Sequence, residues 1–488
     1  MSMIETSTSS AFRPDPAATG GGAATGGRVR NAALLLFVVC AAQFLDAMDI
    51  ATMGPALPQI QRELGMTPDA LQWVVSAYTL GFGSTLLLGG RLADLFDRKK
   101  LLIGGLLVFA IASIAGGLAD GTAVLVVARL LKGVSAGFTA PVAMAILLDA
   151  FRDEKARNRA LGTFLAITTV GYSLGLVVGG VLAGVTWRLV LFLPAAVAVI
   201  VAALALVAVP GGSGRQEQNR QRIDVVGAAL VTGGAIALVY GISRAAAVGW
   251  TDIAVIGPLV AAAALLAVFI LVERAHPTPL IPFAIFTRPQ LVRANLCILM
   301  FGAYVGFQFV LTLYYQDELD WSPLQAGLAF LLGAALTGAT ARYAAVAVTK
   351  YGPWPVATLG LLTLGVGYLA WALLIGHTST MLILLVQQVL GGIGFAAAYT
   401  ALNIAAVGGA RQDEQGLASG LFNAASQIGA GIVLAAITTA FTAHADHGLG
   451  SYRAGLWTIT AVSTAITLLA ATGILANRTK TRLPDLLA

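Results

Sequence analysis

Long apolar segments separated by short polar ones fill this chain of 488 residues from residue 31 nearly to its end. Segments of about 20 residues match the ~30 Å hydrocarbon core of a bilayer at the ~1.5 Å rise per residue of an α-helix. Spans are predicted over residues 31–53, 72–90, 101–119, 123–147, 160–184, 187–209, 225–243, 253–272, 294–315, 324–348, 355–375, 381–407, 416–441 and 454–476. The pattern predicts an all-α integral membrane protein with about fourteen transmembrane helices.

The predicted helices fall into two blocks of six, with two extra helices between them. Such a pattern is typical of large secondary transporters built from two parallel repeats, in which cargo binds between the halves near the bilayer midplane. Residues 1–30 lack the apolar core of a signal peptide and are predicted to be a disordered tail. The predicted parts are a cytoplasmic tail at 1–30, an N-terminal half at 31–210, polar loops with two inserted helices at 211–293, a C-terminal half at 294–476 and a second cytoplasmic tail at 477–488.

Composition and charge agree with a membrane protein. Hydrophobic residues make up 58% of the chain and charged residues 11%, whereas a soluble domain carries about a quarter charged residues. If both termini are cytoplasmic, 23 of the 29 Lys and Arg residues lie on the cytoplasmic side and four lie on the opposite side. This orientation explains the basic surplus better than nucleic-acid binding, which would need a basic cluster with interleaved aromatic residues.

No pattern in the sequence indicates catalysis. The four His residues fall in loops without metal-ligand spacing, Cys40 and Cys297 fall inside apolar spans, and no Ser/His/Asp arrangement can be argued. A phosphate-binding loop of the Gly-x-x-x-x-Gly-Lys-Ser/Thr type is absent from the sequence. We therefore expect no catalytic residues, no metal and no cofactor, and a proton gradient as the energy source.

Four charged residues away from the ends of the predicted spans stand out: Asp46 and Asp49 in the first span, and Arg129 and Lys132 in the fourth. A charge at bilayer depth costs about 3 kcal/mol or more, so the residues that carry one usually line a cavity or move protons. A spacing of three places each pair on neighbouring positions of one helix face. We expect these four residues to couple transport to protons. The alternative is that Asp49 faces water at the outer surface while Asp46 forms a structural ion pair with Arg129.

The turn after the second predicted span reads GGRLADLFDRKK, residues 89–100. It resembles the signature loop of the major facilitator superfamily, Gly-x-Leu-Ala-Asp-Arg-x-Gly-Arg-Lys/Arg, although Leu95 and Asp97 replace the expected Arg and Gly. The resemblance implies a cytoplasmic gate that contacts a helix N-terminus in the opposite half. The alternative is a positively charged cytoplasmic turn without a gating role. The matching positions are Gly90, Leu92, Ala93, Asp94, Arg98 and Lys99.

Further motifs resemble the fourteen-span drug:proton antiporters of this superfamily. Residues 48–58, MDIATMGPALP, are similar to the antiporter motif that carries an Asp at the position of Asp49. Residues 128–141, ARLLKGVSAGFTAP, resemble the fourth-span motif whose Arg is implicated in proton coupling, with Lys132 in place of a usual Gln. Residues 171–180, GYSLGLVVGG, are similar to the antiporter motif Gly-Pro-x-x-Gly-Gly, but Leu176 replaces the Pro and leaves antiport itself open.

Polar and aromatic residues inside spans are candidates for the lining of a cargo cavity. Many of them have the alternative role of joining helices or anchoring the protein at the interface. Tyr314 and Tyr315 fit the aromatic belt at the outer end better than the cavity. The candidates are Gln43, Tyr78, Tyr172, Tyr304, Phe307, Gln308, Gln387, Gln388, Tyr399, Asn403, Asn423 and Gln427.

The sequence leads to a proton-coupled exporter of hydrophobic or cationic small molecules, of the multidrug efflux type, in a bacterial plasma membrane. We expect a monomer whose partners are its cargo, protons and the lipid bilayer, with no nucleic acid. Two alternatives stay open, an exporter or flippase of a lipid or endogenous metabolite, and a membrane receptor or scaffold that does not transport.

Overall fold

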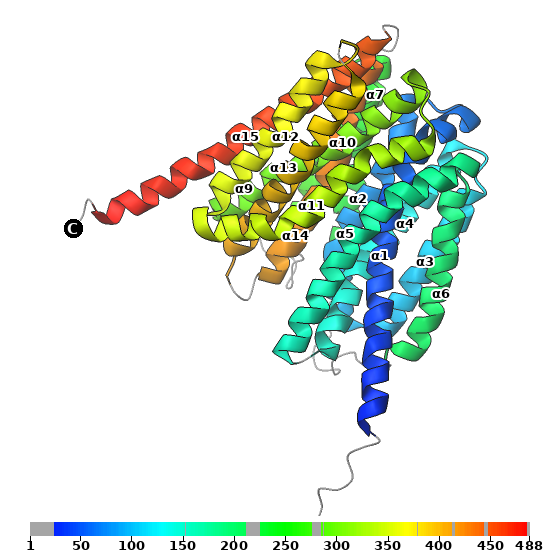
Figure 1. The fold of residues 1–488 in the computed structure, drawn as a ribbon, viewed down its shortest axis with the longest axis vertical. Helices are drawn as coiled ribbons and strands as arrows, with labels where there is room; N and C mark the ends of the chain where they lie inside the picture. Colours follow the sequence, from blue (N-terminus) through cyan, green and yellow to red (C-terminus); the bar gives the residue numbers. More distant parts are fainter. Residues whose placement is uncertain are drawn as a thin grey trace, which may run out of the picture.

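The computed structural model describes residues 24–151, 153–210, 225–275, 285, 287–377, 379–411, 415–443 and 448–485, and these residues form a bundle of long helices (Figure 1). Eleven helices are long and apolar enough to cross a membrane, and two shorter apolar helices, Val170–Val185 and Ala229–Ile242, accompany them in the described part. The prediction of an all-helical protein with about fourteen spans is confirmed.

The first six helices pack mainly against one another. Helix α2 lies along α4, α1 along α5, and α3 against both α4 and α6. We call these six helices the N-terminal half. Their bounds are α1 Ala24–Leu64, α2 Pro68–Leu95, α3 Arg98–Gly117, α4 Thr122–Ala150, α5 Glu154–Val185 and α6 Leu189–Ala208.

The helices from residue 289 onward form a second group, which we call the C-terminal half. Helix α12 packs on α13 and α15, and α11 packs on α13. Figure 1 shows α15 extending well beyond the rest of the bundle. The elements are α9 Pro289–Cys297, α10 Met300–Leu313, a π-helical turn η2 Tyr314–Glu318, α11 Pro323–Tyr351, α12 Pro353–Leu374, α13 Thr380–Gly408, α14 Gln415–Thr442 and α15 Leu449–Asp485.

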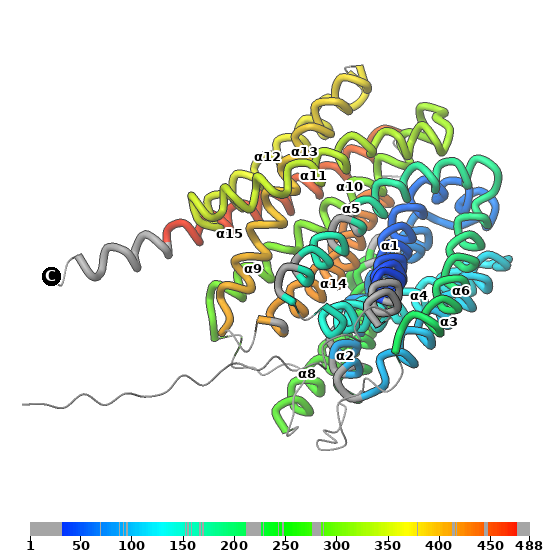
Figure 2. The backbone as a smooth tube through the Cα atoms, turned by 60° about the horizontal axis from the view of Figure 1, so that its bottom comes forward, coloured from blue at the N-terminus to red at the C-terminus, as the bar shows by residue number. Residues whose placement is uncertain are grey.

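Between the halves, α7 (Val225–Val248) and α8 (Ile253–Ala275) form a hairpin. Helix α7 contacts α14 of the C-terminal half and α2 of the N-terminal half, and α8 lies at the edge of the bundle in Figure 2. The inserted helices thus cover the place where α2 and α14 meet. We retain the division into six, two and six helices as a proposal.

Several boundaries differ from those predicted. Helix α1 starts at Ala24, so the predicted disordered tail is wrong for residues 24–30, while residues 1–23 lie outside the described part. Helix α15 continues to Asp485 where a tail was predicted from residue 477, and residues 486–488 are not described. Both extensions follow from cooperativity, because adding a residue to an existing helix is far easier than starting one. The predicted span at 294–315 is instead built from α9, α10 and η2.

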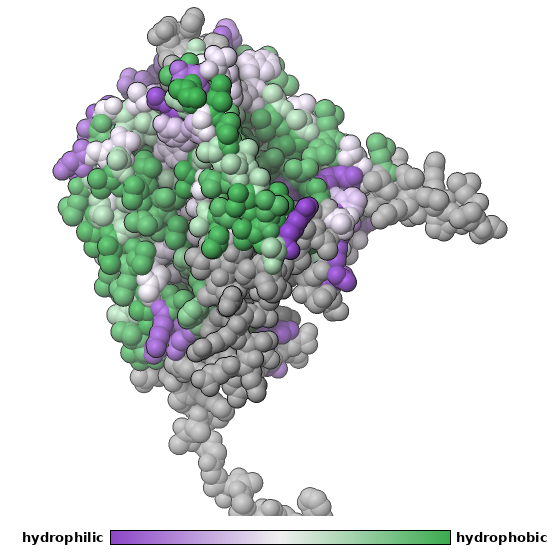
Figure 3. Space-filling model, turned by 180° about the vertical axis from the view of Figure 1, so that it is seen from behind, coloured by the Kyte–Doolittle hydropathy of each residue, from purple (hydrophilic) through white to green (hydrophobic). Residues whose placement is uncertain are grey.

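Hydropathy divides the surface into zones. Apolar side chains cover the middle of the face in Figure 3, and the polar side chains gather toward its ends. The many exposed apolar residues, among them Ile111, Val185 and Leu359, indicate a surface that lipid surrounds.

Small residues let the helices approach closely at the α2–α4 crossing. A Cβ added to Gly133 would lie 2.9 Å from the Cα of Tyr78, and one added to Gly137 would lie 2.8 Å from the carbonyl oxygen of Phe82. Only glycine fits at these positions, as expected for helix pairs whose backbones touch inside a membrane.

At one end of the bundle the two halves are joined by direct contacts. The side chain of Gln316 donates to the carbonyl oxygen of Pro55 at 2.9 Å, and Arg62 pairs with Asp317 at 3.3 Å. We call these two contacts the end-closing contacts. The π-helical turn η2 supplies both Gln316 and Asp317, so the break in this span places them against α1.

We predict that Gly133→Ala lowers the thermal unfolding temperature in detergent by several degrees, since overpacking a tight contact costs about 1–3 kcal/mol. Gly104→Ala in α3 is the control, because its Cβ would meet no atom within 4 Å. Equal melting temperatures for the two variants would contradict the close α2–α4 contact.

Candidate functional site

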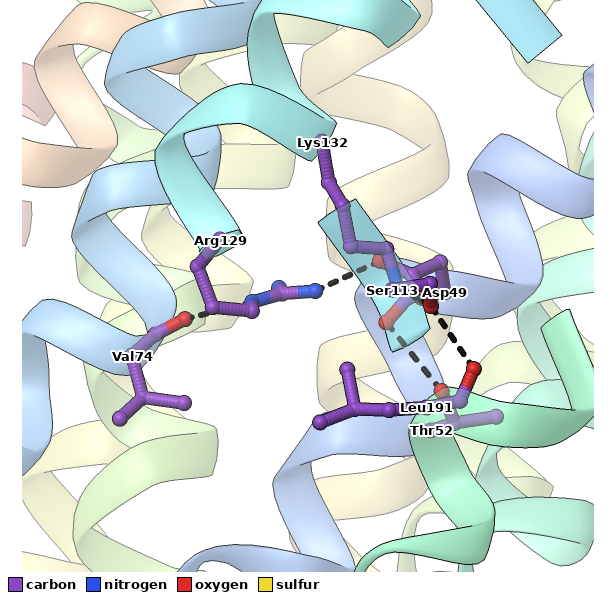
Figure 4. Close-up of polar contacts among 7 residues, drawn as sticks. All are labelled: Asp49, Thr52, Val74, Ser113, Arg129, Lys132 and Leu191. Carbon is purple, nitrogen blue, oxygen red and sulfur yellow. Dashed lines mark hydrogen bonds and ion pairs between the residues drawn. The ribbon is translucent and has the colours of Figure 1, made fainter. Parts of the chain in front are cut away.

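The candidate site is built around Asp49 of α1, whose side chain is fully buried. Its Oδ2 accepts a hydrogen bond from Arg129 Nη1 at 2.6 Å, and its Oδ1 accepts one from Lys132 Nζ at 2.5 Å (Figure 4). Arg129 and Lys132 lie three residues apart on α4, so one helix face presents both cations to the same carboxylate. The alternative in which Asp49 faces outer-surface water is wrong, because two cations enclose it.

Arg129 is oriented by α2. Its Nε donates to the carbonyl oxygen of Val74 at 2.8 Å, and its guanidinium lies 4.6 Å from the centroid of the Tyr78 ring. Tyr78 is itself fully buried. The structure therefore gives Tyr78 an alternative to the predicted role of lining the cargo cavity. Its ring forms one wall of the pocket that holds the Arg129 guanidinium.

Lys132 is oriented by α3 and, through it, by α6. Its Nζ donates to Ser113 Oγ at 2.8 Å and lies 4.5 Å from the centroid of the Phe109 ring. Ser113 Oγ in turn donates to the carbonyl oxygen of Leu191 at 2.7 Å. We call Asp49, Arg129, Lys132 and Ser113 the charge cluster, and its contacts tie α1, α2, α3, α4 and α6 together.

Asp46 lies one helical turn before Asp49 and has a different environment. It is 4% exposed, and its Oδ2 accepts a hydrogen bond from Thr139 Oγ1 at 3.2 Å. Arg129 pairs with Asp49 instead, so the alternative of an Asp46–Arg129 ion pair is wrong. The two acids are therefore distinct: Asp49 is held by two cations, and Asp46 is held by a neutral hydroxyl group.

The loop predicted to form the gate is tied to its own half in the described contacts. Asp97 caps α3 by accepting hydrogen bonds from the backbone of Lys99 at 2.9 Å and Lys100 at 3.3 Å, which explains why an Asp can replace the motif Gly. Arg98 pairs with Asp149 and donates to the carbonyl oxygen of Ala93 at 2.7 Å. The side chain of Asp94 lies outside the described part, and Gly90 is half-buried, so the gating role stays a prediction.

Some candidate cavity residues meet between the halves. Tyr172 of α5 donates its hydroxyl hydrogen to Gln308 Oε1 of α10 at 2.6 Å. Within the C-terminal half, Tyr304 packs at a tilt against Phe395, with ring centroids 4.4 Å apart, and Phe395 stacks against Tyr399. The Tyr399 hydroxyl donates to Asn423 Oδ1 at 3.3 Å.

Other candidates join helices or stay unassigned. Gln387 packs on Gly367 of α12, Gln388 on Gly333 of α11, and Gln427 on Gly83 of α2. Phe307 is buried between Tyr368 and Trp371 inside the C-terminal half. Gln43 and Asn403 are half-buried, which leaves their cavity role a prediction.

The prediction that Tyr314 and Tyr315 belong to an aromatic belt is wrong. Their exposed fractions are 4% and 0%. Tyr315 stacks on Trp321 with centroids 4.8 Å apart, and both tyrosines contact Trp371. The π-helical turn rotates them inward, which residue spacing on a regular helix does not predict.

Sequence reasoning missed Ser113, Phe109, Val74 and Phe395. Ser113 and Phe109 lie four apart in an apolar span, where a small hydroxyl residue is common. Val74 contributes only its carbonyl oxygen, so no side-chain signal could have found it.

A model of the Major Facilitator Superfamily matches residues 39–434. The chain belongs to this superfamily. It is therefore a transporter rather than an enzyme, and a multi-pass membrane protein, and its resemblance to the fourteen-span drug exporters is confirmed.

Among its relatives, the puromycin resistance protein pur8 of Streptomyces alboniger is 34% identical over 85% of this chain and 83% of the relative. The cephamycin export protein CmcT of Amycolatopsis lactamdurans is 34% identical over 84% of this chain and 85% of the relative. EfpA of Mycobacterium tuberculosis, described as an uncharacterized MFS-type transporter, is 33% identical over 82% of this chain and 75% of the relative.

Solved structures confirm the fold. The nucleoside transporter NupG aligns with a TM-score of 0.66 at 12% identity, covering 91% of this chain and 99% of that one. The peptide transporter POT in complex with sulfate aligns with a TM-score of 0.66 at 18% identity, covering 91% of this chain and 94% of that one.

We predict that Asp49→Asn destabilises the protein far more than Asp46→Asn does. Losing Asp49 leaves two buried cations without a counter-charge, at a cost of about 3–5 kcal/mol. Losing the Asp46 carboxylate disturbs a single hydrogen bond to a neutral group, worth about 1 kcal/mol. Thermal unfolding of both purified variants in the same detergent measures the difference. Equal losses would show that the two acids share the ionic network.

Proposed function

We propose that the protein exports a hydrophobic small molecule across a bacterial plasma membrane in exchange for protons. It works as a monomer with both termini in the cytoplasm. Family membership, and relatives named for puromycin resistance, cephamycin export and lincomycin resistance, support the export of small molecules. The proposed orientation rests on the asymmetry of basic residues between alternate loops.

Proton coupling is supported by the position of Asp46. This acid is buried beside the charge cluster but takes no part in the ion pairs of the cluster. Asp49 forms ion pairs with both Arg129 and Lys132, so neutralising its carboxylate would leave two buried cations without a counter-charge. Among the described residues, Asp46 accepts a hydrogen bond from the neutral hydroxyl of Thr139 and forms no ion pair, so it can gain or lose a proton without breaking one. We therefore assign proton exchange to Asp46, and to Asp49 the task of holding Arg129 and Lys132 in place.

Helix α1 connects this proton site to the contact between the halves. It carries Asp46 and, further along, Pro55 and Arg62, which make the end-closing contacts with Gln316 and Asp317. A change in how α1 sits against α4 at Thr139 is transmitted along one continuous helix to those contacts. Breaking and remaking them is the step that alternating access requires at this end.

We predict that Asp46→Asn abolishes accumulation driven by a pH gradient but keeps exchange without a gradient. Proteoliposomes with an acidic lumen are given radiolabelled puromycin or lincomycin outside, and uptake is compared with counterflow at equal pH. Uptake by protein-free liposomes is subtracted, because both molecules are weak bases that an acidic lumen traps without a transporter. Asp46→Glu, which retains the carboxyl group, is the matched control and keeps part of the gradient-driven uptake. Accumulation by Asp46→Asn at the level of the unchanged protein would contradict the assignment of Asp46.

We also predict that linking the end-closing contacts stops transport. Arg62→Cys combined with Asp317→Cys, treated with a short bifunctional thiol reagent, holds η2 against α1 and lowers uptake at least about tenfold. Each single Cys variant is a control, because the native Cys40 and Cys297 are buried. Full uptake by the cross-linked protein, with linkage verified by mass spectrometry, would rule out opening at this end.

A further inference from the structure

In the part of the chain that the structure describes, the buried charges of the two halves leave no uncompensated negative charge for a cationic cargo. Glu273, a further buried acid, lies in the last turn of α8, outside both halves. Inside its spans, the N-terminal half contributes Asp46 and Asp49, and it balances them with Arg129 and Lys132. The spans of the C-terminal half add no acid, because residues 294–316, 321–412, 415–443 and 449–484 contain neither Asp nor Glu. These groups therefore sum to zero when Asp46 is ionised and to one positive charge when Asp46 is protonated.

Arg129 balances one of the two acids, and Lys132 is the residue that balances the other. Its Nζ takes one oxygen of Asp49 while Arg129 takes the other, so both carboxylate oxygens already have cationic partners. The remaining surroundings of Nζ are Ser113 Oγ and the face of Phe109. A cationic cargo would have to displace a buried ammonium group that is held on three sides.

The surface between the halves offers neutral groups instead. Tyr172 and Gln308 meet there as a hydroxyl and an amide, and within the C-terminal half the rings of Tyr304, Phe395 and Tyr399 form an aromatic strip. These three ring-bearing residues are half-buried, so each keeps an accessible edge. Stacked rings flanked by hydroxyl and amide groups suit a flat apolar molecule that makes a few hydrogen bonds.

We infer that the cargo is an uncharged aromatic molecule with hydrogen-bonding groups, and that Lys132 is the residue that excludes permanent cations. This inference rests on the proposed export function and narrows it. A full positive charge acts over several ångströms in surroundings of low dielectric constant, so Lys132 affects cargo selection without touching the cargo. Replacing Lys132 by a neutral residue would leave one negative charge whenever Asp46 is ionised.

The test compares two probes, chloramphenicol as the neutral aromatic molecule and tetraphenylphosphonium as the permanent cation. Proteoliposomes with an acidic lumen report accumulation of each probe by the unchanged protein, by Lys132→Gln and by Lys132→Arg. We expect the unchanged protein and Lys132→Arg to accumulate chloramphenicol in preference to tetraphenylphosphonium. Lys132→Gln is expected to raise the ratio of cation to neutral probe by about tenfold or more, because one full charge is removed.

A binding measurement separates this inference from the proposed function. Dissociation constants of both probes are measured in detergent, where no gradient or transport is needed. If the unchanged protein binds chloramphenicol over tetraphenylphosphonium, and neither probe nor puromycin nor lincomycin accumulates under the gradient, proton-coupled export fails and the cargo inference stands. If the unchanged protein binds or accumulates tetraphenylphosphonium as well as chloramphenicol, the cargo inference fails while transport stands. The cargo inference is also overturned if Lys132→Gln folds and its ratio of cation to neutral probe equals that of the unchanged protein. If Lys132→Gln does not fold, the preference of the unchanged protein for chloramphenicol over tetraphenylphosphonium is the deciding result.

Discussion

The double ion pair of Asp49 with Arg129 and Lys132 is the interaction on which the N-terminal half depends. Three charges inside a membrane protein are tolerable only when each is paired and hydrogen-bonded, and here the acid of α1 pairs with two cations of α4. Arg129 reaches the backbone of α2, and Lys132 reaches Ser113 of α3. The cluster therefore fixes how these helices sit around α1, and the glycine contact between α2 and α4 gives it the close packing it needs.

This arrangement also gives two neighbouring acids different surroundings. Asp49 pairs with two cations, whereas Asp46, one turn away, accepts a hydrogen bond from a neutral hydroxyl group. A proton on Asp46 changes the net charge of the region without dismantling its ion pairs. Charge can thus change at the centre of the half while the helices keep their packing.

The contacts between the halves are chemically different from those inside the N-terminal half. Apart from the Arg62–Asp317 pair at one end, the described contacts between the halves that carry the site argument are neutral hydrogen bonds and glycine packing. Neutral contacts are weak enough to exchange as the halves move, whereas buried ion pairs would resist separation. The ion pairs of Asp49 hold one half together, and the neutral contacts between the halves can break and form again. Both properties suit the proposed transport of an uncharged cargo by alternating access.

The sequence by itself determined the helical membrane architecture, because apolar runs of bilayer length leave no other stable fold, and it singled out the four buried charges, because the membrane makes them costly. It also determined the family, through motif spacing. Only the tertiary structure decided which acid pairs with which cation, since Asp46 and Asp49 lie on neighbouring positions of one helix and sequence spacing treats them alike. It likewise decided the roles of Ser113 and Tyr315, because a backbone carbonyl partner and a π-helical turn leave no periodic signal in the chain.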